Sequence, residues 1–217
     1  MKKILSAFLL LYFAIAFSQE KNRCTGRTSR SLKTGPAKSA TQRCHSVHRK
    51  LLFTKWTDVA DYFPGKTIIN RGFGGSRLTD LNYFADDLLA PYQPKQIVIY
   101  CGENDFADNH QLKAKVVVDR YKAFYKKIRE RFPDIEVDYI SIKYSPSREV
   151  IWPQMKVANK KIAAFMKKQP NAEFIDITKA MEDANGNVRK DIFVEDMLHF
   201  KPEGYKIWTK VITPYLK

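Results

Sequence analysis

From Trp56 to the end, the chain alternates short runs of β-branched and aromatic residues with longer amphipathic stretches. The run at 96–101 (QIVIYC) is almost continuously apolar, which is typical of a strand covered on both faces. Strands that are separated by crossover helices predict a parallel sheet with helices on both faces, a three-layer α/β/α fold. Strands are expected at 66–70, 96–101, 135–142 and 172–177, and helices at 77–89, 112–132, 153–168 and 203–216.

The first eighteen residues have the features of a secretory signal peptide. Lys2 and Lys3 precede an apolar run at 4–17, and the small residues Ala16 and Ser18 stand at the positions that a signal peptidase reads. The run is shorter than the roughly 20 residues that span a membrane, although a retained anchor is the alternative interpretation. We therefore expect cleavage before Gln19, a secreted or periplasmic protein, and no transmembrane segment after cleavage.

Residues 19–52 form a basic segment without strand or helix periodicity. Residues 21–57 contain ten Lys or Arg and no Asp or Glu, whereas 58–217 are nearly balanced, with 26 basic and 22 acidic residues. A charge block of this kind is more typical of a solvated segment than of a nucleic-acid site, so no nucleic-acid partner is expected. A parallel sheet normally opens with a strand here, and the sequence indicates that this first strand is disrupted.

The three cysteines give limited information. Cys24 and Cys44 can pair in an oxidising compartment, which leaves Cys101 over. Cys44, His45 and His48 match no standard zinc spacing, so no metal site is expected.

Three polar clusters follow predicted strands or lie in the last loop, where open α/β sheets place their sites. Asn70 to Ser76 (NRGFGGS) is a glycine-rich turn, and Gly102 to Asp105 (GEND) is either a turn with a helix cap or a source of a donating amide. Asp196 precedes His199 by three residues, so its carboxylate can orient the imidazole as a general base, although one such spacing alone is weak.

In this order, the three clusters resemble the conserved blocks of the SGNH (GDSL-type) serine ester hydrolases, whose domain has a flavodoxin-like α/β/α fold. The resemblance covers residues from about Trp56 onward, and the phrases INRGFGGS, SIKYSPSR and FVEDMLHF resemble secreted bacterial members. It implies a hydrolase domain at 53–217, a monomer or dimer, and a serine acyl-enzyme mechanism with no metal and no organic cofactor. It also implies that His199 is the base, that Asp196 orients it, and that Gly75 and Asn104 donate to the oxyanion.

The nucleophilic serine of that family is missing from its expected place. In similar members it stands five residues before a Trp, and counting back from Trp56 reaches Leu51. Either residues of about 21–52 are translated in a shifted frame, or the chain is a pseudoenzyme that keeps the fold for binding. Ser46 and Ser76 are the alternative nucleophiles, one too early and the other within the glycine-rich loop.

The resemblance therefore predicts an extracytoplasmic ester hydrolase of the esterase, lipase or acetylesterase type, impaired as written because Leu51 replaces the serine. Its substrate would be an acyl or acetyl ester of a carbohydrate or lipid. The alternatives are a non-catalytic glycan- or lipid-binding protein and, less favoured by the charge distribution, a polyanion binder acting through residues 21–57. Trp152, Phe106 and Tyr144 are candidates for lining the cleft, but they suit a core or surface position equally well.

Overall fold

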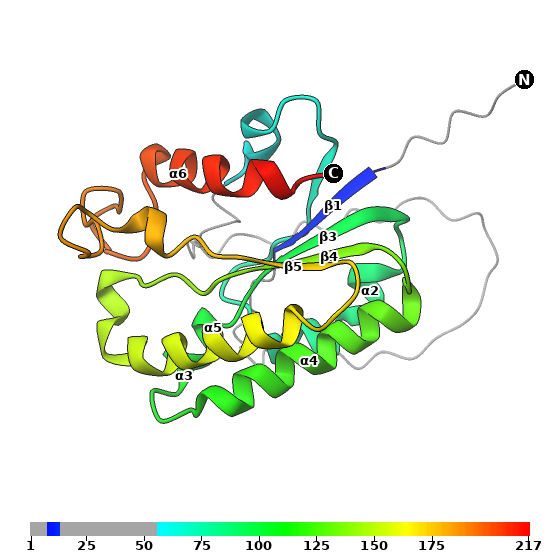
Figure 1. Cartoon of the computed structure of the whole chain (residues 1–217), viewed down its shortest axis with the longest axis horizontal. Helices are drawn as coiled ribbons and strands as arrows, with labels where there is room; N and C mark the ends of the chain where they lie inside the picture. The colour runs from blue at the N-terminus through cyan, green and yellow to red at the C-terminus, as the bar shows by residue number, and fades with distance from the viewer. Residues whose placement is uncertain (1–7, 14–55) are drawn as a thin grey trace, which may run out of the picture.

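The computed structural model describes residues 8–13 and 56–217 (Figure 1). Its centre is a five-stranded parallel sheet with the order β2-β1-β3-β4-β5. This arrangement confirms the predicted α/β fold with a parallel sheet. The strands are β1 Phe8–Phe13, β2 Ile68–Asn70, β3 Pro94–Tyr100, β4 Glu136–Ile140 and β5 Ala172–Ile175.

Side chains of β3 alternate between two separate hydrophobic cores, because successive residues of a strand point to opposite faces. Ile97 and Ile99 lie in the core under α1, α2, α4 and α5, whereas Val98 and Tyr100 lie in the core under α6 and η1. Figure 1 shows the same layering, with α4 and α5 on one side of the sheet and α6 on the other. The helices are α1 Leu78–Tyr83, α2 Ala85–Leu89, α3 Glu103–Asp108, α4 Ala114–Arg131, α5 Trp152–Met166 and α6 Pro202–Ile212, with 3-10 turns η1 Val59–Tyr62, η2 Pro146–Ile151, η3 Lys179–Met181 and η4 Thr213–Tyr215.

The predicted elements from 66 onward are all present, with two changes in the helices. The stretch at 77–89 forms two helices rather than one, because Phe84 leaves helical geometry (φ −93°, ψ 19°) between α1 and α2. The last helix ends at Ile212 rather than Leu216, since Pro214 cannot donate a helical hydrogen bond and the chain continues as a 3-10 turn.

The first strand is found at an unexpected place in the sequence. The structure forms β1 from Phe8–Phe13, within the run predicted to be the core of a signal peptide, and pairs it with both β2 and β3. A short apolar run of this kind suits a doubly covered strand as well as a signal peptide, and periodicity cannot separate the two. The predictions for 19–52, including the disrupted strand and the Cys24–Cys44 pair, fall outside the described residues. Cleavage before Gln19 stays a prediction.

Two buried polar residues connect β3 and β4 to the C-terminus at the amino ends of these strands. The Gln96 amide donates to Asp138 (Nε2 to Oδ2, 2.5 Å) and to the carbonyl of Tyr215 (2.8 Å), and it accepts from the backbone N–H of Lys217 (2.9 Å). Both side chains are fully buried. The opposite, carboxyl end of the sheet carries the polar clusters identified from the sequence. Within the described ranges, no helix combines the length and apolarity that crossing a membrane requires.

Candidate active site

Asp196 and His199 form a closely bonded pair in the loop that precedes α6. The ring Nδ1 of His199 lies 2.5 Å from Oδ2 of Asp196, while Oδ1 accepts the backbone N–H groups of Leu198 and His199, both at 2.9 Å. Met197 between them adopts a left-handed backbone (φ 52°), which folds the loop back on the carboxylate. Burial alone would raise the pKa of Asp196, but these N–H groups and the ring lower it to about 2. The carboxylate therefore stays ionised and holds the ring in one orientation.

The Asn104 side chain lies against the glycine-rich loop after β2. Its Nδ2 donates to the carbonyl of Ser76 at 3.1 Å, which connects the start of α3 to the end of that loop. Gly75, next to Ser76, has φ +77°, a conformation that glycine adopts without strain. The structure thus places Asn104 against the loop that contains Gly75, the other predicted oxyanion donor, although the two residues are 29 positions apart in the sequence.

Gly102 makes the sharp turn that places Asn104. Its φ is +119°, and a Cβ at this position would lie 3.0 Å from Cδ1 of Ile142 and 3.3 Å from the Tyr139 hydroxyl. The chain therefore passes from the end of β3 into α3 through a position that only glycine fits.

A buried ion network that the sequence analysis did not identify lies beneath Asn104. Glu103 is 5% exposed and accepts from Lys143 Nζ (2.8 Å), from the Ser145 hydroxyl (2.6 Å) and from the Tyr100 hydroxyl (2.8 Å). Lys143 also donates to Ser145, and its Nζ lies 5.9 Å from the centre of the Phe200 ring, beside His199. Burial would raise the pKa of Glu103, but Lys143 and Arg148 lower it to about 2, whereas burial lowers that of Lys143 to about 8.

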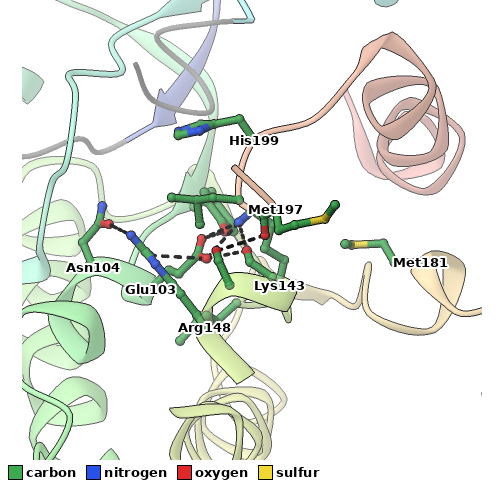
Figure 2. A network of polar contacts seen from close by, with 12 residues as sticks. Glu103, Asn104, Lys143, Arg148, Met181, Met197 and His199 are labelled. Atoms are coloured by element: carbon green, nitrogen blue, oxygen red, sulfur yellow. Dashed lines mark hydrogen bonds and ion pairs between the residues drawn. The ribbon is translucent and has the colours of Figure 1, made fainter. Parts of the chain in front are cut away.

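The segment at 145–148, between β4 and α5, contacts both halves of the site. The backbone N–H and the hydroxyl of Ser147 donate to the carbonyl of Met197, at 3.1 and 3.0 Å. Arg148 donates to Asn104 (Nη2 to Oδ1, 2.9 Å) and forms an ion pair with Glu103 (Nη1 to Oε1, 3.3 Å). Figure 2 shows the guanidinium between Asn104 and Glu103, with Met197 and His199 on the neighbouring segment. Ser147 and Arg148 belong to the SIKYSPSR phrase at 141–148, which the sequence analysis used only for the family resemblance.

The remaining sequence candidates have different positions. Ser76 is 1% exposed and its carbonyl faces Asn104, so it is part of the loop that bears the candidate donors. Phe106 is fully buried in the core, whereas Trp152 is half-buried and donates to the carbonyl of Ser145 at 3.0 Å. Leu51 and Ser46 lie outside the described residues, as do Cys44, His45 and His48. In the part of the chain that the structure describes, no three His, Cys, Asp or Glu residues are grouped to hold a metal ion.

The parallel sheet with helices on both faces, together with an Asp–His pair and an amide donor beside a glycine-rich loop, defines the class as an SGNH-type α/β/α hydrolase fold. The sequence profile of the GDSL-like lipase/acylhydrolase family matches residues 39–207, and the chain belongs to that family. The match begins inside the basic segment, before the described range 56–217. Comparison with curated proteins gave no significant match.

Solved structures with similar folds include several esterases and lipases. A GDSL-like lipase from Bacteroides thetaiotaomicron is 16% identical, with a TM-score of 0.65 over 95% of this chain and 86% of that one. A variant of an acetyl-xylooligosaccharide esterase from Geobacillus is 15% identical, with a TM-score of 0.63 over 98% and 95%. A member of the lipolytic G-D-S-L family from Veillonella parvula is 14% identical, with a TM-score of 0.63 over 96% and 97%. At these identities, the similarity shows the shared fold.

Proposed function

We propose that the chain hydrolyses a small acyl ester, with His199 as general base, Asp196 as the carboxylate that orients it, and Gly75 and Asn104 as oxyanion donors. The observation that carries this proposal is the 2.5 Å contact between His199 Nδ1 and an ionised Asp196. A histidine held in this way can accept the proton of an attacking hydroxyl and later return it to the leaving group. N–H groups fixed before the reaction stabilise the negative charge that develops on the carbonyl oxygen.

The substrate class we propose is an acyl or acetyl ester of a carbohydrate or lipid. Support comes from the family of acylhydrolases and from similar folds among a GDSL-like lipase and an acetyl-xylooligosaccharide esterase. The proposed reaction needs neither a metal nor an organic cofactor, because a hydroxyl nucleophile, a base and oxyanion donors complete an acyl-enzyme mechanism.

The experiment that tests the proposal locates the nucleophile as well as the activity. The full chain is treated with a fluorophosphonate, which labels activated hydroxyl nucleophiles, and the labelled peptide is identified by mass spectrometry. Hydrolysis of 4-nitrophenyl acetate is followed in parallel. We expect His199→Ala to abolish the label and to lower turnover by several orders of magnitude. Label and turnover that persist in His199→Ala would contradict the assigned base.

The second candidate is a glycan- or lipid-binding protein without turnover. The observation that favours it is that counting back five residues from Trp56, as the family resemblance implies, reaches Leu51 rather than a serine, and a leucine cannot attack a carbonyl. Under this hypothesis, the chain gives neither label nor hydrolysis, and calorimetry detects saturable binding of acetylated oligosaccharides or lipids. Sequencing of the coding DNA across codons 19 to 56 separates the two hypotheses, because a shifted frame that encodes Gly-x-Ser before Phe53 would restore the hydrolase.

We further propose that the protein acts outside the cytoplasm, as a monomer or dimer. Lys2, Lys3 and the apolar run after them support export. The mass of the N-terminal peptide of the exported protein tests this proposal, and the expected peptide begins at Gln19.

A further inference from the structure

The orientation of the Asn104 amide is determined by two contacts of opposite character. A side-chain amide has one accepting oxygen and one nitrogen that carries two hydrogens. Here the oxygen accepts from Arg148 Nη2 at 2.9 Å, and the nitrogen donates one hydrogen to the carbonyl of Ser76 at 3.1 Å. Rotation of the amide by half a turn would place oxygen against oxygen at Ser76 and N–H groups against the guanidinium. The observed orientation leaves the second N–H of Asn104 as the candidate oxyanion donor.

Arg148 is itself held in place by a buried carboxylate. Its side chain is 15% exposed, and Nη1 lies 3.3 Å from Oε1 of Glu103. Glu103 also accepts from Lys143, Ser145 and Tyr100, so its position is fixed from three further directions. Of the two cations that contact this carboxylate, Lys143 and Arg148, it is Arg148 that also contacts Asn104, so its positive charge lies next to the candidate donor. Such a charge favours an oxyanion at the adjacent donor.

We propose that Arg148 is the positioning residue for Asn104, with Glu103 as its anchor. Arg148 acts through the amide and fixes which atom of Asn104 faces the developing negative charge. The inference rests on the proposed function for its kinetic consequence, whereas the orientation of the amide is a property of the protein without substrate. The role requires a planar group whose two separate nitrogens contact Asn104 and Glu103 in a fixed geometry, which a lysine with its single Nζ does not reproduce.

A double-mutant cycle tests the kinetic consequence with 4-nitrophenyl acetate. Arg148→Ala is expected to lower kcat by about 10-fold or more with little change in KM, and by less than the ~100- to 1,000-fold that loss of one oxyanion donor costs. Because Arg148 acts through Asn104, the double variant Arg148→Ala/Asn104→Ala should be no slower than Asn104→Ala alone. Multiplicative losses in the double variant would overturn the proposal.

Nuclear magnetic resonance of the 15N-labelled full chain tests the orientation even if the protein shows no turnover. The Asn104 side-chain N–H pair is assigned by its absence in Asn104→Ala. In Arg148→Lys, this pair should move toward the positions of a solvent-exposed amide and exchange faster, while the backbone spectrum is retained. An unchanged Asn104 pair in Arg148→Lys would overturn the proposal. Absence of turnover in the unmodified chain, with the expected shift in Arg148→Lys, would count against the proposed function alone.

Arg129→Lys is the matched control. Arg129 also makes several hydrogen bonds, to the carbonyls of Ile135, Pro170 and Asn171, but at the opposite end of the sheet. Its replacement removes a multiply bonded guanidinium without touching Asn104. We expect lower thermal stability in this variant and an unchanged Asn104 pair. A shift of the Asn104 pair as large as in Arg148→Lys would show a general loss of stability and would also overturn the proposal.

Discussion

At the scale of single residues, the two oxygens of the Asp196 carboxylate have different partners. One oxygen contacts the His199 ring and the other accepts two backbone N–H groups of the same short loop. The loop and the ring orientation are therefore fixed by the same side chain. An uncharged amide at this position retains an acceptor for the loop but presents a weaker or reversed partner to the ring.

We expect Asp196→Asn to lower kcat by on the order of 100- to 10,000-fold, because the ring loses the partner that fixes its tautomer. The measurement is the turnover of 4-nitrophenyl acetate at neutral pH. Asp191→Asn is the control, since Asp191 lies on the same stretch of chain and pairs with Arg189 at the surface. Equal losses in the two variants would show that the effect comes from disturbance of the loop.

The low pKa of Asp196 determines the pH range over which this carboxylate stabilises the fold. The pKa of Asp196 in the folded chain is about 2, below its unfolded value of about 3.9, so its contribution to stability is present above the unfolded pKa and is lost as pH falls toward 2. An acidic decline of activity between about pH 5 and 7 would therefore come from another group.

At the scale of elements, the sequence predicted what periodicity and chain order determine. The run at 96–101 and the stretch at 112–132 appear as β3 and α4, because apolar spacing distinguishes a buried strand from a long amphipathic helix. The spacing from Asp196 to His199 also identified a pair that is in contact, since both residues belong to one loop. In contrast, Arg148 and Asn104 are separated by 44 positions, and their contact depends on how the loops after β3 and β4 meet.

The turn between β3 and α3 depends on Gly102, which has a positive φ and little space around its Cα. Gly102→Ala should lower the free energy of unfolding by about 1–3 kcal/mol or more, because the new Cβ meets Ile142 and the backbone is strained. Gly65→Ala is the matched control, since Gly65 also has a positive φ (+81°) but open space around its Cα. Urea unfolding measures both variants. Equal losses would mean that backbone strain alone matters, without the contact to Ile142.

At the scale of the whole molecule, Asp138 connects the sheet to the C-terminal end of the chain through Gln96. Burial, together with the carboxylates of Glu136 and Glu173, raises the pKa of Asp138 to about 7, against the lowering effect of Gln96 and the Glu173 N–H. Because the folded pKa lies above the unfolded value, this stability is fully present below about pH 4 and is lost as pH rises through about 7.

We therefore expect the urea concentration at the unfolding midpoint to decrease as the pH rises from about 4.5 to 7.5. This dependence of the midpoint on pH should be weaker in Asp138→Asn, because asparagine keeps an acceptor for Gln96 and cannot ionise. Glu173→Gln is the control for general charge removal on the neighbouring strand. An unchanged slope in Asp138→Asn would contradict the assignment of the pH dependence to this group.

Strand β1 lies within the predicted signal peptide, so export with cleavage would conflict with formation of the sheet. Its six residues are the only described link between β2 and the other strands, and they also lie in the segment that an export peptidase would discard. Among the described strands, cleavage would remove the partner that β2 and β3 share. Each would then have an edge of unpaired backbone N–H and C=O groups, which can pair with another strand. The same residues cannot be both a signal peptide that is cleaved off and an internal strand of the mature sheet. An exported and cleaved protein therefore needs another strand between β2 and β3, either from its own basic segment or from a neighbouring chain.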